Sequence, residues 1–277
     1  MAASIDPNML TAPFQLTASM HRDIYSAVDP KSPALRVDGK VVLITGAGGG
    51  LGYLENTAAS LNVPALVAPC DVTSESDIAS VFEKGKRRFE KVDVVVNTAG
   101  TVNVNGVIGE IDPRQWWVDF ETNVKGTYNL FHHFLNTTEG KGTFINLISL
   151  GASMLAPGIS SYSTAKLAAI KLAEYFDLEH PKLRIFSLHP GVVEAENGCG
   201  MVIDHLTPFA KDKAALTAGV TLYLQRPEAD FLRGGFVSVN WDIKEMERHK
   251  DEILDEKLLK LGFLRAKLGP YGHPWSK

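Results

Sequence analysis

The chain has 277 residues, of which 45% are hydrophobic and 22% charged, and its formal net charge is −4. This composition is typical of a globular protein with one medium-sized domain, and no basic stripe or long apolar stretch accompanies it. The two cysteines, Cys70 and Cys199, match no metal-ligand spacing, so we expect no metal site. From the composition we expect a cytoplasmic protein without a nucleic-acid partner or a membrane span.

Strands alternate with helical patterns along most of the chain, which predicts an α/β fold with a Rossmann-like doubly wound parallel sheet in a single domain. Continuous apolar runs predict buried strands at 40–45, 65–70, 92–97, 143–149, 183–189 and 236–240. Helical patterns predict helices at 50–61, 74–91, 113–136, 161–176 and 214–225. The proposed division is an N-terminal arm at 1–37, the domain at 38–245 and a C-terminal extension at 246–277.

A glycine-rich turn, TGAGGGLG at residues 45–52, follows the first predicted strand. Glycines let the backbone approach a diphosphate, whose charge is stabilised by the N-terminus of the next helix. The turn is not a Walker loop, because no Gly-Lys-Ser/Thr follows, and Leu51 breaks the strict G-x-G-x-x-G pattern. By itself it is as consistent with a structural loop as with a cofactor site.

Tyr162 and Lys166 lie four residues apart on one predicted helix, so their side chains share a face, and Ser149 closes the strand before it. A tyrosine has an unperturbed pKa of about 10, and a neighbouring ammonium favours its phenolate. Ser149 could hold a substrate oxygen while Tyr162 transfers its proton and a cofactor carries a hydride. The Tyr/Lys spacing alone is also common on helix surfaces that have no catalytic role.

Several motifs taken together resemble the short-chain dehydrogenase/reductase family in both order and spacing. They are TGAGGGLG, NTAG at 97–100, Asn123, Ser149, YSTAK at 162–166 and HPGVV at 189–193. The resemblance covers residues 38–242, and the segment FLRGGFVSVNWDIKEM at 231–246 is similar to fungal members, many of which serve secondary metabolism. The resemblance implies an NAD(P)-dependent oxidoreductase that interconverts an alcohol and a ketone on a small, fairly apolar substrate. It also implies that the protein forms a homodimer or homotetramer.

The resemblance also implies a role for each matched position. Tyr162 would be the catalytic acid/base, Lys166 would lower its pKa and bind the ribose, and Ser149 would orient the substrate carbonyl. Asn123 would hold the water that relays protons to Lys166. The residues implied to contact the cofactor, besides Tyr162 and Lys166, are Gly46, Gly50, Leu51, Gly52, Asp71, Asn97, Ala99, Gly100 and Val193. Among these, Asp71 would meet the adenine and Val193 the nicotinamide amide.

The segment between the glycine turn and Asp71 is shorter than the resemblance requires. Family members place a helix, a second strand and a further helix there, whereas residues 53–70 suffice for one crossover helix. One account is an internal deletion of roughly thirty residues, which removes the position that selects between NAD and NADP and leaves NADP favoured only as a family-level preference.

The other account is a local rearrangement, in which strand 65–70 pairs with strand 40–45 through one right-handed crossover. That arrangement leaves apolar sheet surface exposed. The alternative to an active enzyme is therefore a catalytically silent relative, which no longer binds cofactor and acts as a subunit partner.

Overall fold

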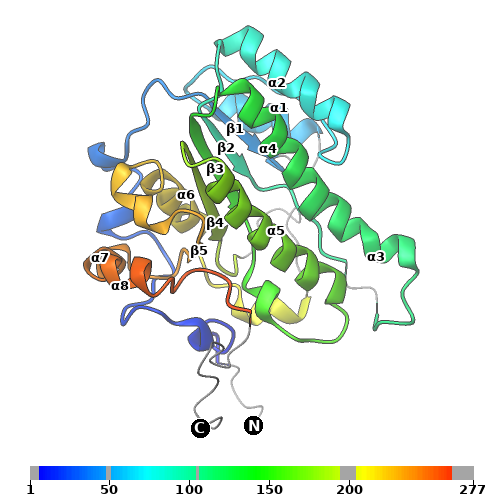
Figure 1. Cartoon of the computed structure of the whole chain (residues 1–277), viewed down its shortest axis with the longest axis vertical. Helices are drawn as coiled ribbons and strands as arrows, with labels where there is room; N and C mark the ends of the chain where they lie inside the picture. The colour runs from blue at the N-terminus through cyan, green and yellow to red at the C-terminus, as the bar shows by residue number, and fades with distance from the viewer. Residues whose placement is uncertain (1–5, 48–50, 104–105, 194–203, 264–277) are drawn as a thin grey trace.

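The structure is a computed structural model of the chain, and it describes residues 6–47, 51–103, 106–193 and 204–263. In this part of the chain five parallel strands form one sheet, in the order β1-β2-β3-β4-β5 (Figure 1). The strands are β1 (Val42–Thr45), β2 (Val94–Asn97), β3 (Gly142–Leu147), β4 (Leu183–His189) and β5 (Phe236–Ser238). The helices are α1 (Leu51–Ser60), α2 (Glu75–Phe89), α3 (Pro113–Phe120), α4 (Gly126–Thr137), α5 (Ser160–Glu179), α6 (Ala214–Tyr223), α7 (Ile243–Arg248) and α8 (Lys250–Asp255). None of the helices described is both long and apolar enough to cross a membrane.

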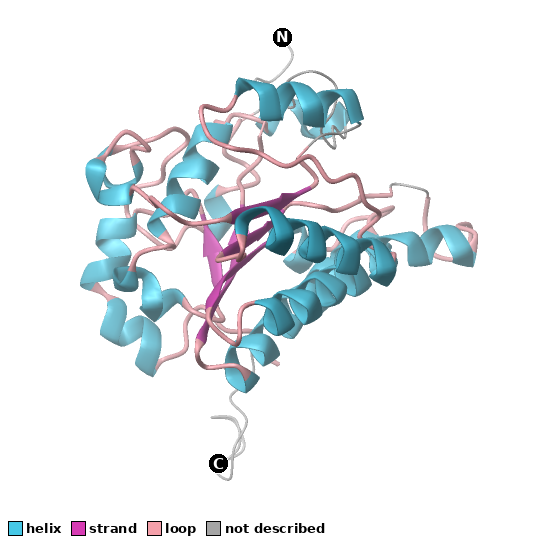
Figure 2. Ribbon diagram, turned by 90° about the horizontal axis from the view of Figure 1, so that it is seen from above, coloured by secondary structure: helices cyan, strands magenta, loops and turns pink. Residues whose placement is uncertain are grey.

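Helices lie on both faces of the sheet, as the view in Figure 2 shows, and this confirms the predicted α/β fold. One face is covered by α2, α4 and α5, whose apolar side chains pack with those of β2, β3 and β4. Its centre is aromatic: Phe131 of α4 stacks on Phe176 of α5 with ring centroids 3.6 Å apart, and both rings meet the edge of Phe144 from β3. Because β2 is buried along its whole length, its sequence VVVN lacks the alternation of a half-exposed strand.

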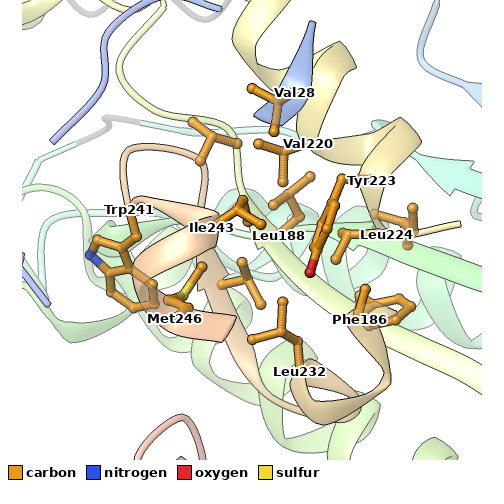
Figure 3. Close-up of a cluster of buried hydrophobic side chains, with 14 of the residues drawn as sticks. Val28, Phe186, Leu188, Val220, Tyr223, Leu224, Leu232, Trp241, Ile243 and Met246 are labelled. Carbon is orange, nitrogen blue, oxygen red and sulfur yellow. The ribbon is translucent and has the colours of Figure 1, made fainter. Parts of the chain in front are cut away.

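The other face is covered by α6, α7 and segments from both ends of the chain (Figure 3). Val28 and Leu35, which belong to the predicted N-terminal arm, are buried in this cluster. Gly219 of α6 permits the arm to approach, because a Cβ at that position would lie 2.0 Å from the Val28 carbonyl oxygen. Ile253 and Leu259, from the predicted C-terminal extension, are buried in the same cluster.

Helix starts follow the capping signals in the sequence. Ser74 caps α2 by accepting a hydrogen bond from the Asp77 N–H at 3.3 Å, and Asp112 caps α3 just before Pro113. The helix predicted over 113–136 is present, but one π-helical turn (Glu121–Lys125) separates α3 from α4. Single π turns of this kind are frequent at functional sites.

The predicted strand at 65–70 is wrong, because residues 64–70 form no strand. Pro64 and Pro69 have no backbone N–H, so this short stretch lacks two of the donors that a sheet ladder needs. β1 pairs directly with β2, with Val42 opposite Val94, and is an edge strand of the described sheet. The pairing of 65–70 with 40–45 is therefore wrong as well.

Apolar surface is exposed beside this edge. Ile44, Val96 and Ile145 occupy one row across β1, β2 and β3, yet Ile44 is 54% exposed whereas Ile145 is fully buried. The large apolar side chains exposed on β1 and in the segment after α1 are Val42, Ile44, Leu61, Val63 and Leu66. Exposed apolar side chains next to an unpaired strand edge favour self-association.

We expect Ile44→Thr to leave the free energy of unfolding within about 0.5 kcal/mol of wild type, because the side chain is already in water and threonine suits a strand. The matched change Ile145→Thr should cost about 2 kcal/mol or more, since it puts a hydroxyl in the core. Urea unfolding measures both values, and light scattering should show less aggregation for Ile44→Thr. Equal losses of stability would mean that the face of β1 is covered.

Candidate active site

Polar side chains mark the carboxyl ends of the first three strands. Thr45, Asn97 and Asn146 lie in one row across β1, β2 and β3, and all three are buried. The Thr45 hydroxyl donates to Asn97 Oδ1 at 2.7 Å, and Asn97 Nδ2 donates to Asn146 Oδ1 at 2.8 Å. Asn97 Nδ2 also reaches the Thr127 hydroxyl on α4 at 3.0 Å, so the row is tied to the helix that follows the π turn.

Gly46 lies where β1 turns toward α1. Its φ of +66° is in the left-handed region, and a Cβ there would lie 2.8 Å from the Ala99 backbone nitrogen. The turn therefore packs backbone to backbone on the segment after β2, where the Ala99 N–H donates to the Thr45 hydroxyl at 3.2 Å. Leu51 and Gly52 are the first residues of α1, and Gly50 lies outside the described residues.

Asn123 is buried in the π turn between α3 and α4. Its Nδ2 donates to the Thr101 carbonyl at 2.9 Å, and its own carbonyl accepts from the Thr127 hydroxyl at 2.8 Å. Its side-chain Oδ1, by contrast, is buried and accepts no hydrogen bond from the part of the chain that the structure describes. Buried amide oxygens nearly always accept a hydrogen bond. Asn123 Oδ1 can therefore accept one from a further donor.

The side chains of Asn123 and Lys166 both lie against the backbone of Gly100. A Cβ on Gly100 would lie 2.8 Å from Asn123 Oδ1 and 3.3 Å from Lys166 Nζ, so both atoms face this stretch of bare backbone. Lys166 is buried, and its Nζ donates to the Leu147 carbonyl at the end of β3, at 2.9 Å. Burial lowers the pKa of Lys166 to about 8.

Ser149 and Tyr162 lie side by side on the two segments that follow β3. The Ser149 hydroxyl is close enough to the phenol to lower its pKa, and Ser149 Oγ accepts from the Gly151 N–H at 3.0 Å. Gly151 keeps them close, because a Cβ there would lie 3.1 Å from both Ser149 Oγ and a carbon of the Tyr162 ring. Lys166 Nζ lies over that ring, 5.9 Å from its centroid.

The pKa of Tyr162 is raised above its usual value, chiefly by burial, while Ser149 lowers it by less. The sequence led us to expect the opposite direction, because a neighbouring ammonium favours a phenolate. The difference arises because burial is the largest influence on the phenol, whereas the Lys166 ammonium, which donates to the Leu147 carbonyl, does not shift the Tyr162 pKa.

Asp71 lies in a tight turn just before α2 rather than at the end of a strand. Its Oδ1 accepts from both the N–H and the hydroxyl of Thr73, each at 2.8 Å. The next residue, Val72, is buried against α4, where a Cβ on Gly126 would lie 2.8 Å from the Val72 side chain. The turn is therefore held beside the π turn, but the described contacts of Asp71 are local.

Val193 lies after β4 in a turn held by Asp212. Residues 193 and 212 form an isolated parallel bridge, and Asp212 Oδ2 accepts from the Val192 N–H. The other carboxylate oxygen, Oδ1, accepts from Arg22 at 3.0 Å and from Asn240 at 2.9 Å. The N-terminal arm therefore helps to hold the segment that includes Val193.

Sequence reasoning brought Asn123, Ser149, Tyr162 and Lys166 into one site, and the structure places them together. It missed Asp212, whose partners come from both ends of the chain, and a second buried carboxylate, Asp119. For Asp119 the available signal was its position four residues before Asn123, on the same face of the predicted helix.

Comparisons with known proteins agree with this geometry. A family model described as enoyl-(acyl carrier protein) reductase matches residues 33–239. The chain is 28% identical to the short chain dehydrogenase mpl6 of Monascus purpureus over 286 aligned positions, which cover 91% of this chain and 97% of that protein. It is 29% identical to the short chain dehydrogenase pigC of Monascus ruber over 298 positions, covering 93% and 97%. Both alignments are longer than the 277-residue chain, so each includes residues of the relative that have no counterpart here.

Solved structures are similar in fold. A short-chain type dehydrogenase/reductase from Mycobacterium ulcerans aligns with a TM-score of 0.63 at 20% identity, over 72% of this chain and 88% of that one. A 7α-hydroxysteroid dehydrogenase complexed with NADH and 7-oxo glycochenodeoxycholic acid aligns with a TM-score of 0.64 at 19% identity, over 78% and 97%. At these identities the likeness establishes the fold.

We expect Gly46→Ala to lower the free energy of unfolding by about 2 to 4 kcal/mol, because the new methyl collides with the backbone at Ala99 in addition to the strain of a positive φ. Gly39 is a matched control: its φ is +72°, but open space surrounds the position. Gly39→Ala should therefore cost only the backbone strain, about 1 kcal/mol. Urea unfolding compares the two variants, and equal losses would refute the close approach of the turn to residue 99.

Proposed function

Because the chain belongs to the short-chain dehydrogenase/reductase family, we propose that it is an NAD(P)-dependent oxidoreductase that interconverts an alcohol and a ketone. The observation that carries the proposal is the convergence of Asn123, Ser149, Tyr162 and Lys166 around the ends of β2 and β3. We further propose a small, fairly apolar substrate and a role in secondary-metabolite biosynthesis, which the similarity to fungal short chain dehydrogenases supports.

The residues present fit a nicotinamide cofactor at the catalytic end of the site. Asn123 Oδ1 is buried and unsatisfied, and Gly100 leaves bare backbone against it and against Lys166 Nζ. The described residues that would hold the cofactor are Gly46, Leu51, Gly52, Asp71, Asn97, Ala99, Gly100, Tyr162, Lys166 and Val193. Gly50, which lies outside the described residues, completes the proposed set. We propose NADP or NAD, with NADP favoured only as a family-level preference.

Tyr162 is the proton donor when the reaction runs toward the alcohol. The reduced nicotinamide, when bound, supplies the hydride that reaches the carbonyl carbon. Since burial raises the pKa of Tyr162, the phenol is protonated at neutral pH and can donate to the carbonyl oxygen. The Ser149 hydroxyl, close to the phenol, lies where it can orient that same oxygen. In the direction of oxidation Tyr162 first loses its proton, and the phenolate then takes the alcohol proton.

Lys166 supports the proton transfer as a buried cation. Its Nζ lies 5.9 Å from the centroid of the Tyr162 ring, so the cation is close to the phenol that gives up the proton, although it does not itself shift the Tyr162 pKa. Asn123 Oδ1 faces the same place as Lys166 Nζ and is free to accept a hydrogen bond from a water that returns the proton.

We also propose that the chain forms a homodimer or homotetramer through α4 and α5. Both helices are complete and carry large side chains that point into solvent. The exposed large apolar side chains on the described parts of these helices are Tyr128, Leu167, Tyr175 and Leu178. Interfaces between subunits often bury exposed apolar patches of this kind.

Tyr162→Phe should lower turnover by about a thousandfold or more, because a phenyl ring has no hydroxyl proton to transfer. The fold should change little, and the affinity for dinucleotide should fall only modestly, because the phenol is one of several groups proposed to hold the cofactor. Reduction of a panel of cyclic and aryl ketones, with NADPH or NADH followed by absorbance, measures the effect. Tyr175→Phe is the matched control, since it removes an exposed hydroxyl from the same helix. Undiminished turnover by Tyr162→Phe would refute the assignment of the proton donor.

Reduction should slow as the pH rises through about 8, where Lys166 loses its proton. The sign follows from the requirement that Tyr162 be protonated and Lys166 charged, both of which hold at lower pH. The pH dependence of kcat between pH 6 and pH 10 measures this limb. A profile that stays level to pH 10 would contradict the role given to the buried ammonium.

A further inference from the structure

Asp119 is a buried carboxylate to which the reaction described above gives no role. It lies on α3 one helical turn before Asn123, and its side chain is fully inaccessible to solvent. None of the ion pairs among the described residues includes it. A buried charge without a countercharge is costly unless hydrogen bonds satisfy it, so its surroundings are informative.

Four hydrogen bonds hold this carboxylate and join three segments around the active site. Oδ1 accepts from the Thr101 hydroxyl at 2.9 Å and from Asn103 Nδ2 at 2.8 Å. Oδ2 accepts from the Asn103 N–H at 3.2 Å and from the Ser161 hydroxyl. Ser161 directly precedes Tyr162 on α5, and the Thr101 carbonyl is the acceptor for Asn123 Nδ2.

The charge of Asp119 also acts on the catalytic pair. Burial is the largest influence on both groups, and it lowers the pKa of Lys166 and raises that of Tyr162. Asp119 raises both pKa values, and among the described residues no other charged side chain shifts either of them. The remaining groups that face Lys166 are uncharged at neutral pH: the Tyr162 ring, the Asn123 amide and the Leu147 carbonyl.

We propose that Asp119 is a positioning residue of this active site, which fixes the Thr101–Asn103 loop and the start of α5 and places a negative charge against Thr101, the neighbour of the Gly100 backbone that Lys166 Nζ faces. The proposal rests on the function proposed above in giving Lys166 and Tyr162 their catalytic roles. A neutral residue of the same shape satisfies most of the hydrogen bonds but removes that charge, and no other charged side chain among the described residues shifts the Lys166 pKa. The negative charge is therefore the property that matters.

The test measures the titration of Lys166 directly in the full chain. Lysine labelled with 13C at the ε carbon reports each ammonium by NMR, and Lys166→Met identifies the resonance. The wild-type midpoint is expected at about 8. In Asp119→Asn the midpoint should fall by about half a pH unit or more, and the alkaline limb of ketone reduction should move with it.

Two controls separate charge from architecture. Asp112→Asn removes a carboxylate from the exposed cap of the same helix, where asparagine caps equally well, and should leave the midpoint in place. Ser161→Ala removes one hydrogen bond to Asp119 but keeps the charge, so it should also leave the midpoint in place. Asp119→Ser is a second neutral variant, to be used if Asp119→Asn does not fold.

A lower midpoint in a neutral Asp119 variant, with both controls unchanged, supports the proposal. An unchanged midpoint in a folded neutral variant overturns it, even if that variant is less stable than wild type, because a merely structural residue lowers stability alone. The two proposals fail separately: a wild-type chain that reduces no ketone, but whose Lys166 midpoint falls when Asp119 is neutralised, refutes the function and supports the electrostatic role.

Discussion

The interaction on which the rest of the structure depends is the row of polar side chains across β1, β2 and β3. Thr45, Asn97 and Asn146 lie opposite one another, and each of the two neighbouring pairs is joined by a hydrogen bond. Buried amides are costly when unpaired, so a slip of one residue in any of the three strands would leave partners unsatisfied. The row therefore fixes the level at which strands end and catalytic loops begin.

The catalytic residues take their positions from that level. Asn97 also bonds Thr127, whose hydroxyl satisfies the carbonyl of Asn123 in the π turn. Lys166 donates to the carbonyl of Leu147, the last residue of β3. The Lys166 ammonium is thus buried against the end of β3, and Asn123 Oδ1 has no hydrogen-bond partner among the described residues. Both arrangements cost free energy of folding. Arrangements that cost stability in this way are typical of functional sites.

The sequence could predict the features that depend on hydrophobic periodicity or on the spacing of residues along a helix. Apolar runs and capping signals located helices α1 to α6 and five strands, but not the short helices α7 and α8, and helical periodicity put Tyr162 and Lys166 on one face. The strand at 65–70 failed because apolar composition says nothing about the donor that Pro69 lacks. Asp119 could not be found as a hub, since its partners come from the loop after β2 and from α5, segments that only the folded chain brings together. The turn around Asp71, by contrast, is held by local hydrogen bonds from Thr73, and it was missed because the apolar run before it was interpreted as a strand.

We propose that this chain binds a nicotinamide dinucleotide although β1 is an edge strand of the described sheet. A fluorescence titration of the purified, monodisperse chain with NADPH and, separately, with NADH tests this binding directly. We expect saturable binding in the micromolar range to at least one of the two dinucleotides. A folded chain that binds neither would contradict it, and would identify a silent relative of the dehydrogenases.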